Sequence, residues 1–422
     1  MYERTALPDG PRVITARLPG SRAFAVAAYV LAGSRLERRE QAGVAHFMEH
    51  LTFRGTAAFP STRAVSEAIE GVGGTSNAAT DRESTVYWAR LPLREAQRGV
   101  QMLGELIVRP LLRDQEIDRE RDVIVEEIRS YHDDASQFVF NVFDEQFFGD
   151  SGLGREIAGD EATVRGLSGD EIRSFWASSY RPANTVVAVA GDMAHDEAVG
   201  LVAEAFGRGN GPVPDWAPAP AGPVGPRVRL DEREGQQAHL VVGLPALRRD
   251  HPDTWTLEVL NTVLGDGSSS RLFLSLREDA GLAYDVHSFQ ADYADCGTLQ
   301  IYAGVDPDDL GRAVRAITTE LARMRDEPVP EAELEKAKRF AAGHLELRLE
   351  EGRHLVSWLG VQEALHDRVL TLDDALAALD GVSAASIQAL AGRLFVDEGM
   401  CLAVVAPHGT RVPDLEPALR LP

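Results

Sequence analysis

A stretch rich in proline and glycine occupies residues 209–226, almost at the middle of the 422-residue chain. This composition disfavours helices and internal strands, because proline lacks a backbone N–H and glycine has no side chain to pack. The stretch therefore predicts a linker between two domains, at 1–208 and 227–422. With 44% apolar residues, each half can bury a core of ordinary domain size.

The two halves repeat the same order of elements. Each has an apolar, strand-like run near its start, two helical stretches, and a second strand-like run near its end. In the first half these lie at 23–30, 94–109, 114–132 and 185–190, and in the second half at 238–244, 308–325, 330–350 and 400–405. Strands and helices therefore come in blocks, which predicts a duplicated α+β fold with helices packed on a largely antiparallel sheet in each domain.

The composition excludes several classes of partner. The net charge is −23, whereas binding to nucleic-acid phosphates requires clustered Lys and Arg. The acidity fits either attraction of cationic peptides or plain solubility. No apolar run approaches the roughly eighteen residues that span a bilayer, so no membrane partner is expected. Met1 leads directly into a strand-like segment without a secretion signal, and Cys296 and Cys401 lack metal-ligand spacing, so we expect a cytoplasmic protein.

Two histidines and a glutamate share the segment His46-Phe-Met-Glu49-His50. The apolar residues around them recur at spacings of three and four, which predicts a helix that ends by Gly55. On a helix, His46 and His50 lie one turn apart and can reach a single Zn²⁺, while Glu49 is offset toward a water molecule. Chance produces such a pattern in roughly a few per cent of chains of this composition, so the interpretation requires a third ligand.

The helix predicted at 114–132 offers that ligand. Glu120 and Glu127 are seven residues apart and share a face beside the core, whereas Glu126 points elsewhere. Glu127 would complete a His₂Glu set and leave a fourth position open, as in catalytic zinc sites. Glu120 would orient one of the ligands. The alternative is that both are ordinary glutamates on a solvated helix.

The order and spacing of these residues resemble the inverted zinc motif of the pitrilysin (insulinase) family of metallopeptidases. The resemblance extends through 46–56, Asn77-Ala-Ala-Thr80 and Tyr180-Arg-Pro-Ala-Asn184, and covers nearly the whole chain. The length resembles the smaller branch of the family, which includes mitochondrial processing peptidases and bacterial relatives. The resemblance implies the α+β fold and a zinc-dependent endopeptidase.

The resemblance also implies roles for residues of the first half. Glu49 would take a proton from the attacking water and later protonate the leaving amine. Asn77, Ala78 and Ala79 match an edge strand on which an extended peptide pairs through its main chain, so unfolded peptides would be the substrates. Phe53 matches an aromatic residue that lines the pocket just after the cleaved bond; its alternative role is core packing.

The second half has no equivalent of the metal residues. The segments that match 46–50 and Glu127 fall at 255–260 and near His344, so only the first half would hold zinc. Arg277 and Tyr284 resemble a family pair that reaches the substrate near the scissile bond, where a cation and a phenol would stabilise the developing oxyanion. From the residues alone they would be a cation on a helix surface and a half-buried strand residue.

Partner choice rests on the resemblance as well. Mitochondrial processing peptidases recognise a substrate arginine with acidic residues ten and fourteen places after the metal-binding glutamate. In this chain those two positions are Gln137 and Asn141, so selection of arginine through them is not expected.

Relatives of this size pair two subunits, and the zinc of one subunit faces the Arg/Tyr pair of the other. This chain carries both sets, which predicts a homodimer. The rival interpretations are a subunit of a heterodimeric processing peptidase and a non-catalytic scaffold.

Overall fold

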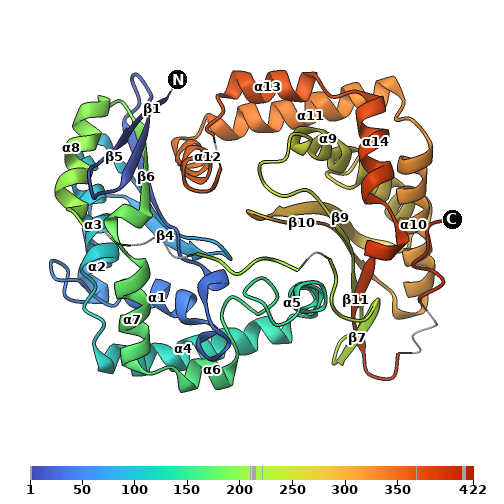
Figure 1. The fold of residues 1–422 in the computed structure, drawn as a ribbon, viewed down its shortest axis with the longest axis horizontal. Helices are drawn as coiled ribbons and strands as arrows, with labels where there is room; N and C mark the ends of the chain where they lie inside the picture. The colour runs from blue at the N-terminus through green and yellow to red at the C-terminus, as the bar shows by residue number, and fades with distance from the viewer. Residues whose placement is uncertain (1, 210, 212–214, 221, 367, 411–414) are drawn as a thin grey trace. The chain divides into compact units, whose positions relative to one another are not determined.

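The computed structural model describes residues 2–209, 211, 215–220, 222–366, 368–410 and 415–422. The predicted linker at 209–226 therefore lies partly outside the described residues. The chain forms two compact units (Figure 1). Unit 1 contains Met1–Ile128, Glu156–Ala217 and Glu346–Thr371, and unit 2 contains Arg129–Arg155, Pro218–Leu345 and Leu372–Pro422. The predicted boundaries at 208 and 227 follow the repeat in the sequence, whereas each compact unit also includes a segment from the opposite half.

Unit 1 is built on a six-stranded sheet in the order β1-β2-β6-β3-β5-β4. Its strands are β1 (Tyr2–Ala6), β2 (Arg12–Arg17), β3 (Ala23–Val30), β4 (Thr75–Thr80), β5 (Thr85–Pro92) and β6 (Thr185–Gly191). Only β2 and β6 pair in parallel, and the other neighbours are antiparallel. Strand β4 lies at the end of this order and pairs only with β5 among the described strands.

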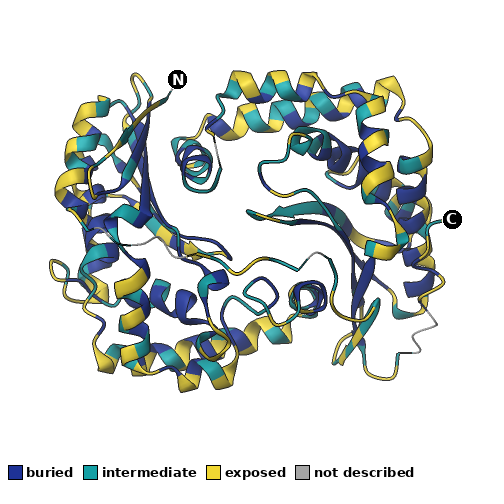
Figure 2. Ribbon diagram, viewed as in Figure 1, coloured by how far each residue is buried: buried dark blue, intermediate teal, exposed yellow. Residues whose placement is uncertain are grey.

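Helices cover both faces of this sheet. They are α1 (Val44–Thr52), α2 (Thr62–Glu70), α3 (Ala96–Val108), the first part of α4 (Asp114–Asp133), α6 (Glu161–Gly166), α7 (Gly169–Ser179), α8 (His195–Phe206) and α12 (Gly352–Leu365). Phe24 and Val26 of β3 join the core beneath α1 and α3, while Ala27 and Tyr29 pack on the opposite face with Leu359 of α12. The central strand is therefore buried on both sides, as its continuous apolar sequence predicts (Figure 2).

Unit 2 has a five-stranded sheet in the order β7-β11-β8-β10-β9. Its strands are β7 (Val228–Arg233), β8 (Ala238–Pro245), β9 (Ala283–Asp292), β10 (Gly297–Val305) and β11 (Cys401–Pro407). Its helices are α5 (Ala135–Phe148), α9 (Thr254–Leu264), α10 (Leu310–Asp326), α11 (Glu331–Leu349, whose last residues belong to unit 1), α13 (Leu372–Asp380) and α14 (Ala384–Leu394). Only β7 and β11 pair in parallel.

The two units share one plan, which accords with a duplication. In each, one face of the sheet packs on helices of its own half, and the other face packs on a helix from the opposite half. That helix is α12 in unit 1 and α5 in unit 2, where Phe143 contacts the core formed with Val241 and Ala403. The prediction of an α+β fold with two largely antiparallel, helix-covered sheets is confirmed.

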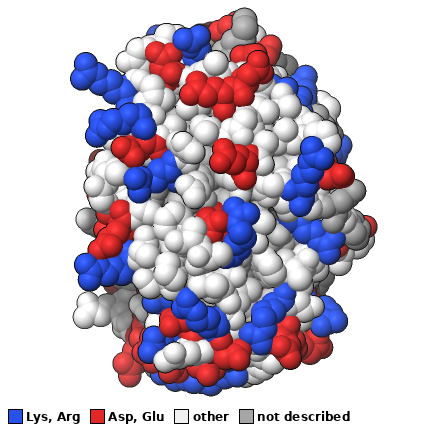
Figure 3. Space-filling view, turned by 90° about the vertical axis from the view of Figure 1, so that its left-hand side faces the viewer, with Lys and Arg blue, Asp and Glu red and all other residues white. Residues whose placement is uncertain are grey.

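Two surface properties complete the description. No single helix of the described chain has the length and apolar character for crossing a bilayer, although α13 and α14, bent by 87°, pass that test as a pair. On the face shown in Figure 3, acidic and basic side chains are interspersed, so the net charge of −23 is not gathered there into a field of one sign.

Candidate metal centre

Helix α1 carries His46, Glu49 and His50, and its start is fixed by two residues. The carboxylate of Glu37 accepts hydrogen bonds from the backbone N–H groups of Gly43 (2.9 Å) and Ala45 (2.7 Å), a favourable place for an acid at a helix N-terminus. Gly43 has φ of 93°, and a Cβ there would lie 2.5 Å from the carbonyl oxygen of Ala158. Only glycine fits this position, so the close approach sets where α1 begins.

The structure brings together the three residues that the sequence singled out as metal ligands. Nε2 of His50 lies 3.3 Å from Oε2 of Glu127, and Nε2 of His46 lies 3.8 Å from the same oxygen. One ligand atom from each residue lies within 4.8 Å of the others, and no other group of three His, Cys, Asp or Glu in the described chain meets this condition. The seven-residue spacing along α4 thus places Glu127 opposite both histidines.

This donor set fits zinc. Two imidazoles and a carboxylate are a common catalytic zinc set, and neighbouring donors of a tetrahedral ion with bonds of about 2.0–2.1 Å lie about 3.4 Å apart. The observed separations of 3.3 and 3.8 Å are close to that value. Burial, with His50 nearby, lowers the pKa of His46 to about 4, so this ring is neutral at pH 7 and offers a lone pair. The residues present therefore suit a divalent ion with one open position.

Glu120 contacts His50 from the side opposite Glu127. Its Oε1 lies 2.9 Å from Nδ1 of His50, and its other oxygen pairs with Arg54. Burial opposes ionisation of Glu120, but the hydrogen bonds from His50 and Arg54 outweigh it and lower the pKa of this carboxyl. Likewise, burial lowers the pKa of His50, but hydrogen bonds to Glu120 and Glu127 outweigh burial and raise it to about 9.

Arg54 is a residue to which the sequence analysis assigned no role. Its guanidinium reaches a carboxylate that is only 2% exposed, while its own side chain is 32% exposed. The sequence feature that could have predicted its role is its position four residues after His50, which places both residues on the same side of the segment that ends α1. Arg54 therefore extends the series of side-chain contacts from His50 through Glu120 toward the surface.

Glu49 is held by a residue of strand β4. The hydroxyl of Thr80 donates a hydrogen bond to Oε2 of Glu49 at 2.6 Å. Burial raises the pKa of Glu49, and the bond from Thr80 partly offsets this. The sequence analysis named Thr80 only as the last residue of the segment Asn77-Ala-Ala-Thr80, which resembles the family. Its position at the end of a predicted edge strand was the one feature that pointed to a role near Glu49. The strand that carries Asn77, Ala78 and Ala79 thus also positions Glu49.

The predicted substrate residues of unit 1 lie near α1 and on the sheet edge. Ala78 donates its backbone N–H to the side-chain oxygen of Asn77 at 2.9 Å, within the outermost strand β4. Phe53 caps α1 and packs against the core, with its ring centroid 6.2 Å from that of Tyr87. Phe53 therefore has the packing role that was its alternative assignment, and the pocket role stays a prediction.

Arg277 and Tyr284 belong to unit 2. Arg277 lies in a π-helical turn (Phe273–Asp279), with its guanidinium carbon 4.9 Å from the ring centroid of Phe273 and 5.1 Å from that of Tyr284. Tyr284 is 75% exposed at the start of β9. Its exposure contradicts the half-buried strand position expected from the residues alone. A large exposed phenol beside a guanidinium is typical of a binding surface rather than of a core.

Two family profiles match the chain. The profile "Insulinase (Peptidase family M16)" covers residues 12–161, and "Peptidase M16 inactive domain" covers residues 166–340. An uncharacterised zinc protease of Streptomyces coelicolor is 34% identical over 412 residues, which span 96% of this chain and 89% of that protein. The chain belongs to the M16 (insulinase) family of peptidases. Within this M16 protein, the His46, His50 and Glu127 group lies in the first profile, and Arg277 and Tyr284 lie in the second.

Other M16 relatives extend the comparison. The beta subunit of the mitochondrial-processing peptidase of Bos taurus is 28% identical, over 96% of this chain and 84% of that subunit. The crystal structure of a protease from Helicobacter pylori has a TM-score of 0.89 at 21% identity, over 96% of this chain and 99% of that one. This structural likeness shows the M16 fold, and relatives named as zinc proteases support a zinc metallopeptidase.

Proposed function

We propose that this protein is a zinc-dependent endopeptidase that cleaves unfolded peptides. The observation that carries the proposal is the convergence of His46, His50 and Glu127 next to a half-buried glutamate, Glu49, on the same helix as the two histidines. When bound by these three side chains, zinc supplies a Lewis acid that polarises a carbonyl and makes water acidic enough to attack at neutral pH.

The remaining steps are assigned to residues of the chain itself. Glu49 takes the proton of the attacking water and passes it to the leaving amine, with its carboxylate held by Thr80 at 2.6 Å. Glu120 and Arg54 hold the His50 ring through Nδ1, which leaves Nε2 on the side of Glu127. Arg277 and Tyr284 are proposed to bind the substrate near the scissile bond and to stabilise the oxyanion.

The proposed substrate is a peptide in an extended conformation. Strand β4 lies at the edge of its sheet, and an added strand could pair with its outer side through Asn77, Ala78 and Ala79. Because main-chain pairing needs a free extended segment, stably folded proteins should be poor substrates.

We also propose a homodimer in the cytoplasm. The chain carries both the metal residues and the Arg277 and Tyr284 pair, so two copies could complete each other's sites. The heterodimeric alternative gains support from the bovine relative, which is named as a subunit. Gel filtration with light scattering decides between them: a dimer of active chains supports the homodimer, whereas an inactive monomer rescued by a second protein supports the alternative.

Zinc analysis combined with peptide cleavage tests the function. Purified wild-type protein should contain one zinc per chain and cleave quenched, unfolded peptides. Glu49→Gln should keep the zinc and lose cleavage by about a thousandfold or more. Glu126→Gln, the same change on the neighbouring exposed residue of α4, should leave both properties unchanged. A wild-type protein that holds zinc but cleaves nothing in a denatured peptide library would favour the scaffold.

A further inference from the structure

Strand β4 has a face that the proposed mechanism does not use. Ala78 is buried in the core that contains α1, whereas Thr75, Asn77 and Ala79, which alternate with it along the strand, are exposed. These three side chains therefore lie on the opposite face of the sheet, which is the side that α12 covers and that lies away from α3 and α8 (Figure 1). A peptide added to β4 would place every second side chain on this face.

The neighbouring strand carries an aromatic ring and a cation on the same face. Asn77 pairs with Trp88 of β5, and Thr75 pairs with Arg90. Residues directly opposite one another in a sheet share a face. Trp88 is half-buried against the core that α12 forms with the sheet, and Arg90 is exposed. The side chains behind the open face of β4 are therefore an indole and a guanidinium.

A second guanidinium reaches Trp88 from α12. The guanidinium carbon of Arg353 lies 4.0 Å from the centroid of the Trp88 ring. Such stacking holds a guanidinium in place and leaves its N–H groups free to donate. Neither Arg353 nor Arg90 forms an ion pair or a hydrogen bond through its guanidinium with any residue that the structure describes. Both groups can therefore donate to a ligand.

The charge around the two arginines is locally positive, although the whole chain carries −23. Strands β4 and β5 contain no acidic residue. The acidic groups next to Arg353 in sequence are the exposed Glu350 and Glu351, and Oε2 of Glu351 lies 3.8 Å from Nδ1 of His354. Burial raises the pKa of Tyr29 to about 12, and the charge of Arg348 opposes this rise, so a third guanidinium acts on this side of the sheet. An anion at this face would be attracted.

A carboxylate on an added peptide can reach these groups across β4. The peptide strand and β5 would be two strand spacings apart, about 10 Å. A glutamate and an arginine side chain that extend toward one another span this distance. The short side chains of Asn77 and Ala79 leave the path over β4 open.

The position of Thr80 sets where in the peptide the carboxylate would be. Thr80 holds Glu49, so it marks the place of the proposed cleavage on β4. Asn77 and Thr75 precede it by three and five residues, which correspond to about 10 and 17 Å along the strand. The side chains opposite them therefore belong to residues about three to five positions from the cleaved bond, on one side of it.

We propose that this face of unit 1 binds an acidic side chain of the peptide substrate, through Arg353 and Arg90 beside Trp88. The inference rests on the proposed peptidase function and adds a substrate preference to it. A carboxylate suits this site because a guanidinium can donate two parallel N–H bonds to its two oxygens. The Trp88 ring holds Arg353 before the peptide binds, which reduces the entropy lost on binding.

Peptides that differ by one charge test the proposal. An unfolded, quenched peptide with an amidated C-terminus carries a single glutamate moved along its length, and each version is paired with its glutamine analogue. At one position, about three to five residues from the cut, glutamate should raise kcat/KM by about five- to tenfold over glutamine, as two partly exposed ion pairs allow. Added salt should reduce the ratio.

Variants locate the effect. Arg353→Gln and Arg90→Gln should each reduce the glutamate-to-glutamine ratio several-fold, and Trp88→Leu should reduce it by releasing Arg353. Arg353→Glu should reverse the preference, so that lysine at the same position is cleaved faster than glutamine. Arg98→Gln removes a guanidinium from α3, on the other side of the sheet, where it pairs with Glu95, and should leave the ratio unchanged.

Binding separates failure of this proposal from failure of the peptidase proposal. Fluorescence anisotropy of labelled glutamate and glutamine peptides needs no cleavage. Tighter binding of the glutamate peptide, lost in Arg353→Gln, supports the site even if no peptide is cut. Equal cleavage of both peptides at every position by an active enzyme overturns the site and leaves the peptidase intact. A glutamate preference that survives in both arginine-to-glutamine variants, or a preference only for a free C-terminal carboxylate, also overturns it.

Discussion

Nδ1 of His50 and Oε1 of Glu120 lie 2.9 Å apart. This hydrogen bond holds Nδ1 on the side of Glu120 and turns Nε2 toward Glu127, 3.3 Å away. Arg54 pairs with the second oxygen of Glu120, so the carboxylate cannot rotate without breaking two contacts. Glu120 and Arg54 therefore orient the ring of His50, a proposed metal ligand, from the side away from Glu127.

Replacing Glu120 should weaken zinc binding without removing a ligand. For Glu120→Gln we expect a loss of affinity of about 10- to 100-fold, because partners of this kind orient the ligand and raise its basicity. Competition with a chromophoric chelator measures it. Glu126→Gln provides the control on the exposed side of α4. Equal zinc affinity in the two variants would contradict a positioning role for Glu120.

Removing zinc should destabilise unit 1, since an ion bound only by the folded state adds to its stability by mass action, by about 2.7 kcal/mol at a concentration 100-fold above Kd. Wild-type protein should melt at a lower temperature in a chelator than in zinc. His50→Ala and Glu127→Gln should show little difference between the two conditions. A zinc-dependent rise of the same size in these variants would place the ion elsewhere.

Thr80 should control the pH profile of cleavage through Glu49. Glu49 must be ionised to accept a proton, and burial raises its pKa above the usual 4.5, so activity should fall as the pH drops through that raised value. The bond from Thr80 lowers this pKa, and Thr80→Val should therefore shift the acidic limb of kcat/KM to higher pH and reduce kcat by about tenfold. Thr80→Ser, which keeps the hydroxyl, should restore both. An unchanged acidic limb in Thr80→Val would exclude this role.

Gly43 should tolerate no side chain. Its φ of 93° disfavours other residues, and a Cβ would lie 2.5 Å from the carbonyl oxygen of Ala158. Gly43→Ala should lower the free energy of unfolding by about 2 kcal/mol or more, measured in urea. Gly200→Ala is the matched control, because Gly200 lies inside the exposed face of α8 with nothing within 4 Å of a Cβ. The control should be neutral or stabilising by about 0.5–1 kcal/mol.

The local part of the fold was predictable from the sequence. The run at 23–30 is β3 and the stretch at 114–132 is α4 to within one residue. The first is a short run of apolar residues, and the second is a long segment whose apolar residues recur at helical spacing. The exchange of segments between the halves was not predictable. The apolar residues of α12, such as Val356 and Leu359, show that the helix has a buried face, but not which sheet it covers.

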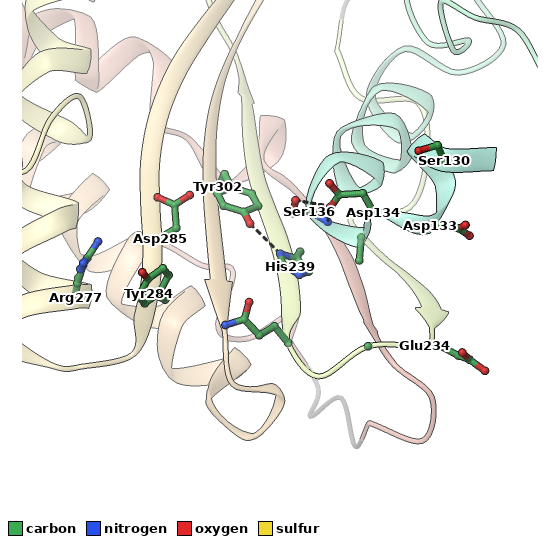
Figure 4. A pocket seen from close by; sticks show the side chains of 13 residues that line it. Ser130, Asp133, Asp134, Ser136, Glu234, His239, Arg277, Tyr284, Asp285 and Tyr302 are labelled. Carbon is green, nitrogen blue, oxygen red and sulfur yellow. Dashed lines mark hydrogen bonds between the residues drawn. The ribbon is translucent and has the colours of Figure 1, made fainter. Parts of the chain in front are cut away.

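The candidate site could likewise be predicted from the sequence only in part. His46, Glu49 and His50 follow from spacing within one helix, and Glu120 and Glu127 follow from spacing within another. Thr80 reaches Glu49 across 31 positions of sequence, and hydroxyls are too common for such a contact to stand out. A pocket of unit 2 is lined by Asp133 at the end of α4, Asp134 at the N-cap of α5, Glu234 after β7 and Asp285 of β9 (Figure 4). Only the folded chain brings these segments together.

The most direct test of the account is a crystal structure of the zinc-loaded protein with anomalous data collected at the zinc edge. We predict one peak in unit 1, bonded to His46, His50 and Glu127 at about 2.0–2.2 Å, with one position left to solvent. A protein that binds no zinc at these three residues, or that holds it in a closed site with a fourth protein ligand, would contradict the account.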